Sequence, residues 1–150
     1  MAMRKTPSDY TTYQAALIFS RANRKLNDFL STQLAQFEIS VPEWGYLGVL
    51  HDTQAVKVQT AAALLGVEPP FATRLGNRLV DKGLVSFSLD PTDGRVRLIS
   101  ITNKGDALIT SVESTLRPDM KVYLESINQT NMETFLSVMA QLSELPASRP

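Results

Sequence analysis

Four side chains that can hydrogen-bond to DNA lie close together on a predicted helix between residues 70 and 82. They are Thr73, Arg74, Asn77 and Arg78. Residues three and four apart share one face of a helix. A guanidinium can hold guanine through two hydrogen bonds in the major groove, and an asparagine amide can hold adenine in the same way. This face is therefore a candidate for reading base pairs. The alternative is an ordinary solvated face, on which Arg78 pairs with Asp81 or Asp93.

Two further arginines lie in a predicted β-hairpin with a Pro/Asp/Gly tip. Alternating apolar residues predict its strands over Val85–Leu89 and Arg95–Ile101. Arg95 comes directly after the tip and is a candidate for contact with DNA. Arg97 either contacts DNA as well or only covers the exposed face of its strand. The carboxylate of Asp93 repels DNA, so we expect it to fold the turn or to orient an arginine.

The sequence argues against catalysis and metal binding. His51, beside Asp52, is the only histidine, and there is no cysteine. A lone histidine at a helix end is more often a cap or a surface residue than a metal ligand. The chain has no strained serine turn and no glycine-rich phosphate loop. We therefore expect no enzyme activity, no metal and no cofactor, and the lack of cysteine excludes a thiol-oxidation switch.

Two short helices position the candidate DNA-reading face. The first covers Val58–Leu65 and ends at Gly66, and the second begins at Pro69–Pro70 and stops before Gly83. Two helices joined by a few residues around a glycine predict a helix-turn-helix. Its inward side is apolar and consists of Ala62, Leu65, Val67, Ala72, Leu75 and Leu79.

Longer elements are predicted before this motif. Ser8 or Asp9 caps a first helix, whose apolar stripe continues to Phe37. Ser40 and Glu43 then form a capping box for a second helix that runs to about Leu50. The flanking residues Ile39 and Trp44 occupy the two positions of a hydrophobic staple.

Two helices are predicted after the hairpin. Thr102 caps the first, which covers Asn103 to about Asn128 and is bent at Pro118. Thr130 and Glu133 form a capping box for the last helix. Its apolar stripe consists of Phe135, Leu136, Met139 and Leu142.

Composition favours one ordinary globular domain. The chain has 150 residues, of which 43% are hydrophobic, and its net charge is zero. The segment from Lys57 to Gly105 holds seven cations and four anions, so it is basic while the remainder is acidic. No signal peptide and no apolar run long enough to span a membrane is visible, so we expect a cytoplasmic protein.

Several short motifs between Leu64 and Gly105 occur together at a specific spacing. They are Thr73-Arg74-Leu75, Arg78-Leu79, Lys82-Gly83-Leu84-Val85, Asp90-Pro91 with Asp93 and Arg95, and Thr102 with Gly105. In this order they resemble the recognition helix, the helix exit, the wing and the following helix start of the MarR family of bacterial regulators. Arg95 resembles the family's minor-groove arginine, a cation that gains from the negative potential of a narrow minor groove. The remaining helix order is also similar, so the resemblance covers most of the chain.

The resemblance implies a mainly α-helical winged helix-turn-helix protein with a small β-hairpin wing and long terminal dimerisation helices. It implies a single domain over 1–150, with dimerisation helices at about 8–38 and 106–145 and a DNA-binding lobe at about 40–105. The implied function is transcription regulation by a homodimer on a near-palindromic operator of double-stranded DNA. Repression would be released by a small anionic or phenolic effector, whose binding residues the sequence leaves unknown.

Three departures from the family pattern predict weak binding or fewer phosphate contacts. Glu68-Pro69-Pro70 stands where a capping Ser or Thr is usual, which removes two N–H donors and adds a repelling charge. Ser86-Phe87-Ser88 replaces basic residues of the first wing strand, and Lys57 replaces a small capping residue. The main alternative is thus a protein-interaction module that keeps the winged-helix fold with little DNA affinity. A small ligand-handling enzyme with its site in an interdomain cleft is a further alternative.

Overall fold

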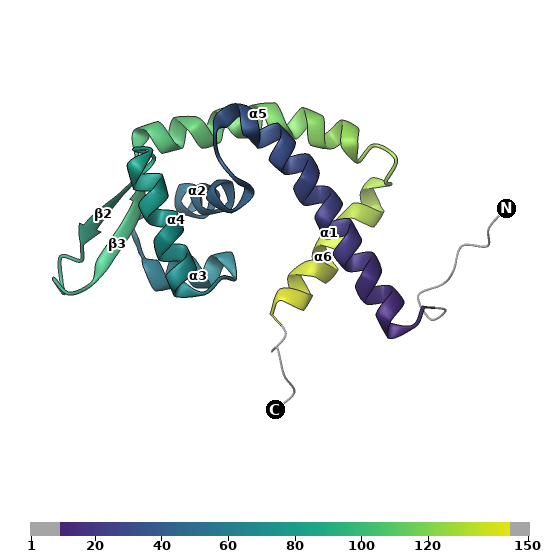
Figure 1. Ribbon diagram of the computed structural model, residues 1–150, viewed down its shortest axis with the longest axis horizontal. Helices are drawn as coiled ribbons and strands as arrows, with labels where there is room; N and C mark the ends of the chain where they lie inside the picture. Colours follow the sequence, from purple (N-terminus) through teal and green to yellow (C-terminus); the bar gives the residue numbers. More distant parts are fainter. Residues whose placement is uncertain (1–9, 145–150) are drawn as a thin grey trace. The chain divides into compact units, whose positions relative to one another are not determined.

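The computed structural model describes residues 10–144. These residues form two compact units, which divide between Val112 and Glu113, inside one helix. Within the described residues, no helix is both long and apolar enough to cross a membrane. The order of elements confirms the predicted mainly helical fold with a small sheet (Figure 1). The elements are α1 (Thr12–Leu34), η2 (Ala35–Phe37), α2 (Val41–Asp52), β1 (Val56–Lys57), α3 (Val58–Leu65), α4 (Pro69–Asp81), β2 (Val85–Leu89), β3 (Arg97–Ile101), α5 (Asn103–Tyr123) and α6 (Gln129–Ser143).

Helix α1 is the first element of the first unit. The predicted caps Ser8 and Asp9 lie outside the described residues, and Thr11 caps the helix that the structure shows. The side chain of Gln14 accepts a hydrogen bond of 3.1 Å from the amide of Thr11. The apolar stripe that continues to Phe37 was expected to lie on one helix. Its last residues instead form the 3-10 turn η2, which Glu38 ends in a left-handed conformation with φ 56°.

Helix α2 confirms the predicted capping box. The carboxylate of Glu43 accepts a hydrogen bond of 2.8 Å from the amide of Ser40. In return, the Ser40 hydroxyl accepts a hydrogen bond of 3.4 Å from the amide of Glu43. The helix continues two residues beyond the predicted end at Leu50. Its buried residues Tyr46, Leu47 and Leu50 form the centre of the core of the first unit.

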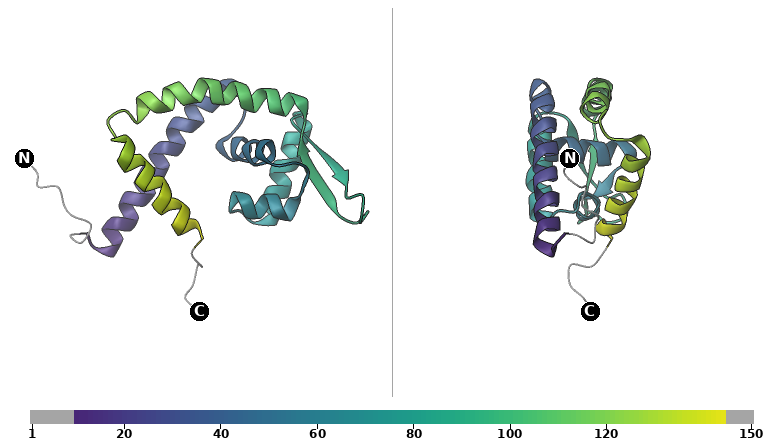
Figure 2. Two further views of the ribbon diagram at one scale, coloured as in Figure 1. Left: turned by 180° about the vertical axis from the view of Figure 1, so that it is seen from behind. Right: turned by 90° about the vertical axis from the view of Figure 1, so that its right-hand side faces the viewer.

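Helices α3 and α4 form the predicted helix-turn-helix. Gly66 ends α3 with φ 64°, and Gly83 follows α4 with φ 71°, both left-handed values that favour glycine. On the predicted inward side, Ala62, Ala72, Leu75 and Leu79 are buried, while Leu65 and Val67 are half-buried. The left view of Figure 2 shows α2, α3 and α4 beside the hairpin, which all three helices contact.

The sheet has three strands rather than the predicted two. Strands β2 and β3 pair antiparallel, with Phe87 opposite Ile99 and Leu89 opposite Arg97. The third strand, β1, pairs with the other edge of β3, so that Lys57 lies opposite Leu98. Two residues are too few to show an alternating pattern, which is why the sequence did not indicate β1. Strand β3 begins at Arg97, two residues after the predicted start at Arg95.

Helix α5 begins as predicted, with the Thr102 hydroxyl accepting a hydrogen bond of 3.1 Å from the amide of Gly105. It ends at Tyr123 rather than near Asn128, and Pro118 lies inside it. The predicted capping box at Thr130 and Glu133 is wrong. Asn128 caps α6, because its side-chain oxygen accepts hydrogen bonds from the amides of Thr130 and Asn131, which already belong to the helix.

Candidate nucleic-acid interface

Helix α4 presents the predicted polar face to solvent. Its buried side consists of Ala72, Leu75, Gly76 and Leu79. The side chains predicted to read bases all lie on the exposed side, and they are Thr73, Arg74, Asn77 and Arg78. The Arg74 guanidinium carbon lies 5.7 Å from the centroid of the Phe71 ring, which restricts where this long side chain points. The helix therefore offers two guanidiniums and one amide on a single exposed face.

Arg78 is partly held by the neighbouring helix. Its Nε atom is 3.9 Å from Oε1 of Glu43, a residue of α2. Neither Asp81 nor Asp93, the partners considered from the sequence, forms an ion pair with Arg78 in the part of the chain that the structure describes. The side chain is still 57% exposed, so it remains available to a ligand.

The first turn of α4 offers few amide donors. Glu68 is the N-cap residue, and its side chain makes no capping hydrogen bond. Pro69 and Pro70 have no N–H, and the amides of Phe71 and Ala72 donate to the carbonyl oxygen of Glu68. A DNA phosphate thus cannot bind this helix end through its first two amides, as the sequence predicted.

Two aspartates shape the wing tip. Oδ1 of Asp90 accepts hydrogen bonds of 2.8 Å from the Thr92 amide and 2.6 Å from the Thr92 hydroxyl. These bonds hold the pKa of Asp90 below its ordinary value. Oδ1 of Asp93 accepts a hydrogen bond of 3.0 Å from the amide of Arg95. Asp93 therefore folds the turn that places Arg95, which was one of its two predicted roles.

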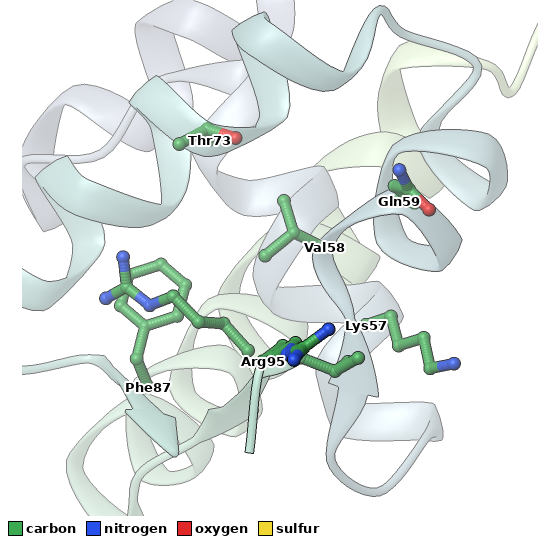
Figure 3. A pocket seen from close by; sticks show the side chains of 8 residues that line it. Lys57, Val58, Gln59, Thr73, Phe87 and Arg95 are labelled. Carbon is green, nitrogen blue, oxygen red and sulfur yellow. The ribbon is translucent and has the colours of Figure 1, made fainter. Parts of the chain in front are cut away.

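An open hollow of about 400 Å³ lies between α4, the wing and the start of α3 (Figure 3). It is lined by Lys57, Val58, Gln59, Thr73, Phe87, Arg95, Val96 and Arg97. Three of these side chains are cationic, and none of the described residues that line it is acidic. Because like charges gather around one concave surface, the hollow attracts anions.

Phe87 supports one of these cations. The guanidinium carbon of Arg97 lies 4.2 Å from the centroid of the Phe87 ring, within the range of a cation–π contact. The strand register places Phe87 and Arg97 on the same face of the sheet. Arg97 therefore lies on the side of the hollow and does not merely cover the outer face of its strand, the lesser role considered from the sequence.

Sequence reasoning missed two residues of the hollow, Lys57 and Gln59. Lys57 directly precedes α3 and Gln59 lies in its first turn, about 40 residues before strand β3 of the wing. They meet the wing only because β1 pairs with β3. The basic side chain of Lys57 at the start of α3 is the one available signal, and in the sequence it indicates only the replacement of a small capping residue.

The remaining candidate chemistry does not form a site. His51, expected to be a cap or a surface residue, is exposed, and its Nδ1 atom lies 2.7 Å from Oδ1 of Asp106. Among the described residues, no cluster of three His, Cys, Asp or Glu side chains with the arrangement of a metal site is found.

Comparison with known proteins identifies the same architecture. A family model of the MarR family matches residues 37–96, which include α2, the helix-turn-helix and most of the wing. Mutant MarR from E. coli complexed with operator DNA is 20% identical, with a TM-score of 0.80, and the match covers 87% of this chain and 93% of that one.

Two further solved structures are similar over nearly the whole chain. BpsR from Bordetella bronchiseptica, whose DNA binding is regulated by 6-hydroxynicotinic acid, is 17% identical with a TM-score of 0.83 and coverage of 91% and 99%. CouR from Rhodococcus jostii RHA1, bound to p-coumaroyl-CoA, is 21% identical with a TM-score of 0.79 and coverage of 90% and 95%. At these identities the likeness establishes the fold.

Proposed function

We propose that this chain, whose residues 37–96 match the model of the MarR family of transcription regulators, is a sequence-specific DNA-binding regulator that acts as a homodimer. The observation that carries the proposal is the exposed face of α4, which bears Arg74 and Arg78, beside a hollow lined by three further cationic side chains. A helix of this kind fits the major groove, and a wing beside it reaches the adjacent minor groove. The family match also argues for a regulator rather than an enzyme.

The two parts of this surface have different roles. Arg74, Asn77 and Arg78 read base edges, while Arg95 enters the minor groove. Thr73 and Arg97 lie in the hollow between these elements, where the DNA backbone passes from one groove to the next. Backbone contacts fix the position of the protein and carry no sequence information of their own. The hollow thus offers phosphate contacts that the first turn of α4 lacks.

The terminal helices support the proposed homodimer. Large apolar side chains are exposed on α1 and on α6, and they are Tyr13, Leu17, Ile18, Phe19, Phe135, Leu136, Val138 and Leu142. Exposed apolar surface of this extent favours burial against a partner. Two-fold pairing is the commonest closed assembly, and it predicts a near-palindromic operator with half-sites roughly 10 bp apart. In this proposal the chain is one domain over 1–150, with its terminal helices dedicated to dimerisation.

We further propose that the protein represses transcription until a small anionic or phenolic effector releases it. The support comes from relatives: one binds p-coumaroyl-CoA, and another is regulated by 6-hydroxynicotinic acid. A protein-interaction module remains a second candidate, favoured by Glu68-Pro69-Pro70 and by the zero net charge. A protein that binds no duplex DNA even at low salt would favour that candidate.

Selection on random duplexes tests the proposed function. We expect an inverted repeat, and we expect Arg74→Ala and Arg78→Ala each to reduce the preference for it by about 1–3 kcal/mol, the usual contribution of one bidentate base pair contact. Lys57→Gln, Arg95→Ala and Arg97→Gln should instead weaken binding to selected and scrambled duplexes alike. Each of these three variants removes one cation. If that cation neutralises a phosphate, the plot of log affinity against log salt concentration should become shallower by about one unit of slope. Lys121→Gln, a change outside the hollow, is the control.

Sedimentation velocity tests the dimer. Leu136→Glu, at a side chain that is 58% exposed, should shift the protein toward the monomer. Leu64→Glu, at a leucine of α3 that is 57% exposed, is the matched control and should leave the mass unchanged. A parent protein that sediments only as a monomer of 16.6 kDa at micromolar concentration contradicts the proposal.

A further inference from the structure

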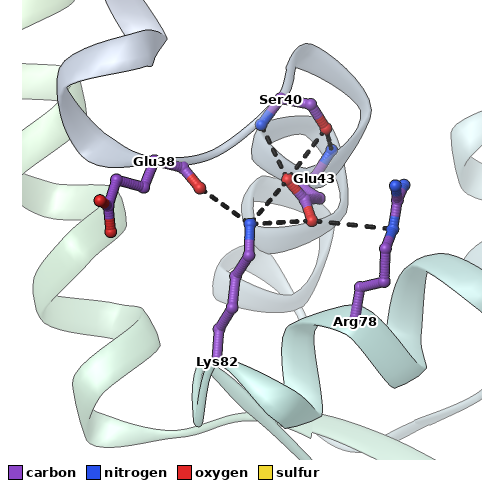
Figure 4. A network of polar contacts seen from close by, with 5 residues as sticks. All are labelled: Glu38, Ser40, Glu43, Arg78 and Lys82. Atoms are coloured by element: carbon purple, nitrogen blue, oxygen red, sulfur yellow. Dashed lines mark hydrogen bonds and ion pairs between the residues drawn. The ribbon is translucent and has the colours of Figure 1, made fainter.

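A buried carboxylate lies behind the exposed face of α4. The Glu43 side chain is only 5% exposed, and it lies beside two cations: Arg78, which belongs to α4, and Lys82, the C-cap of that helix (Figure 4). The Lys82 Nζ atom is 3.0 Å from Oε1 and 3.1 Å from Oε2 of Glu43. The same ammonium donates a hydrogen bond of 2.8 Å to the carbonyl oxygen of Glu38. Helix α2 is thereby tied to the end of α4.

Contacts from two directions fix the position of this carboxylate. The amide and the hydroxyl of Ser40 both donate to Oε2, at 2.8 and 3.0 Å, and Lys82 approaches both oxygens. Burial raises the pKa of Glu43, but the hydrogen bonds from the Ser40 amide, Lys82 and the Ser40 hydroxyl, with the attraction of Lys82, lower it below its ordinary value. Glu43 is therefore a charged and rigid reference point for its neighbours.

Arg78 is the outer and weaker of the two cationic partners. Its Nε atom is 3.9 Å from Oε1, whereas Lys82 is within hydrogen-bond distance. One carboxylate cannot neutralise both cations, so this group keeps a net positive charge. In Figure 4 the dashed line to Glu43 starts at Nε of Arg78, and the terminal nitrogens lie beyond it at the free end of the side chain. The terminal nitrogens are the donors that form a fork toward guanine.

We propose that Glu43 is a positioning residue for base reading: by attracting Nε of Arg78 it holds the guanidinium so that the terminal nitrogens project from the exposed face of α4. This inference rests on the proposed function. An arginine side chain loses much rotamer freedom when it binds. A side chain that is already oriented loses less, and its preference for guanine rises accordingly.

The role is distinct from support of the fold. The capping box and the tie to Lys82 stabilise the first unit whether or not Arg78 is present. Glu43→Gln keeps an oxygen for the Ser40 amide, because glutamine also serves in a capping box, but it removes the charge that attracts Arg78. Ser40→Ala is the comparison variant: it weakens the cap and removes one donor to Oε2, but it keeps the negative charge beside Arg78, so its effect on base reading should be much smaller than that of Glu43→Gln.

A double-mutant cycle tests the inference. Affinities for the selected duplex, a duplex with the guanine read by Arg78 replaced, and a scrambled duplex are measured for the parent, E43Q, R78A, the double variant and S40A. We expect E43Q to lower discrimination at that base pair by about tenfold, within the range of one bidentate contact. Affinity for the scrambled duplex should stay equal or rise, because a repelling charge is gone. In the R78A background E43Q should leave discrimination unchanged.

Thermal unfolding of each variant and the Arg78 Nε–H resonance of the DNA-free protein complete the test. E43Q should shift that resonance, whereas S40A should change both the resonance and the discrimination much less than E43Q does. If the parent and E43Q discriminate equally well, the inference about Glu43 is wrong while the proposed function stands. The same holds if E43Q lowers discrimination as much in the R78A background as in the parent. A parent protein that binds no duplex overturns the proposed function and the inference together.

Discussion

The Arg97 guanidinium stacks on the ring of Phe87, at 4.2 Å from guanidinium carbon to ring centroid. The same ring faces α4, because a Cβ atom added to Gly76 would lie 3.2 Å from its Cζ atom. One aromatic side chain thus contacts both a cation of the wing and the backbone of the helix that presents the base-reading face. The stack explains why an apolar residue is useful in a wing strand that faces DNA.

Phe87→Leu removes the stack while keeping an apolar residue. We expect affinity to fall by about twofold to fivefold on selected and scrambled duplexes alike, because an exposed cation–π contact is worth about 0.5–1 kcal/mol. Arg97→Lys, which keeps the charge but not the planar group, should act similarly. Fluorescence anisotropy on both duplexes measures the effect. Leu89→Ala, at the residue opposite Arg97, is the control, and a weakening confined to the selected duplex would contradict a backbone role.

Gly105 has a packing role that its neighbours make testable. A Cβ atom there would overlap the carbonyl oxygen of Leu84 and lie 2.8 Å from Cγ1 of Ile101. Gly105→Ala should lower the free energy of unfolding by at least about 1–3 kcal/mol, the usual cost of overpacking. Gly48→Ala is the matched control: it lies in α2 with nothing within 4 Å of the added atom. It should raise stability by about 0.5–1 kcal/mol. Urea denaturation that ranks the two variants the other way would contradict this packing.

The fold was predictable wherever the signal is local. The capping box of Ser40 and Glu43 spans three residues, so its chemistry is visible in the sequence. At α6 the predicted cap Thr130 lies two residues after the actual cap, Asn128, whose short side chain reaches the amides of Thr130 and Asn131. Strand β1 was missed because two residues show no periodicity, and only its pairing with β3 defines it.

In the candidate interface, too, the local features were predictable and the contacts between distant segments were not. Helical periodicity alone places Arg74 and Arg78 on the exposed side of α4. The partner of Arg78 was not predictable, since Glu43 lies 35 residues earlier and the contact depends on how α2 packs on α4. Lys57 reaches the hollow for a similar reason, through a strand pairing that no local pattern encodes.

Tyr46 is fully buried, and among the described residues its hydroxyl has no hydrogen-bond partner. An unsatisfied buried hydroxyl costs about 1–3 kcal/mol, so Tyr46→Phe should raise the free energy of unfolding at pH 8 by about 1 kcal/mol. Tyr13→Phe, at a tyrosine that is 64% exposed, is the control and should have little effect. A less stable Tyr46→Phe protein would mean that the hydroxyl is satisfied.

The same residue predicts a pH dependence. Burial raises the pKa of Tyr46 from 10.0 to about 12. The unfolded chain therefore loses this proton near pH 10, while the folded protein keeps it until about pH 12. The stability that the raised pKa provides is fully present below pH 10 and is lost as the pH rises toward 12. The advantage of Tyr46→Phe over the parent should widen across this window, by on the order of 2 kcal/mol. A constant difference in urea titrations at pH 8, 10 and 11.5 would contradict the assignment.

Glu68 tests whether the start of α4 lies against DNA. Its backbone is extended, with φ −67° and ψ 140°, as a capping residue requires, yet its side chain makes no capping bond. Glu68→Ser should add a cap toward the amide of Phe71 and remove a negative charge. Glu68→Gln removes the charge alone. If a phosphate lies nearby, both variants should bind duplex DNA about twofold to fivefold more tightly at 0.1 M salt, and the gain should shrink as salt screens the charge.

Anisotropy titrations at three salt concentrations, with Asp119→Asn as the control in the second unit, separate the two contributions. The gain shared by Glu68→Gln and Glu68→Ser measures repulsion, because both changes remove the carboxylate. Any further gain in affinity that only Glu68→Ser shows measures the new helix cap, provided that the free energy of unfolding of this variant also rises. Serine also gives up the favourable interaction of a carboxylate with the helix dipole, so the net stabilisation should stay below the usual value of about 1 kcal/mol. Unchanged affinity in both variants would place the first turn of α4 away from the phosphates and leave the backbone contacts to the hollow.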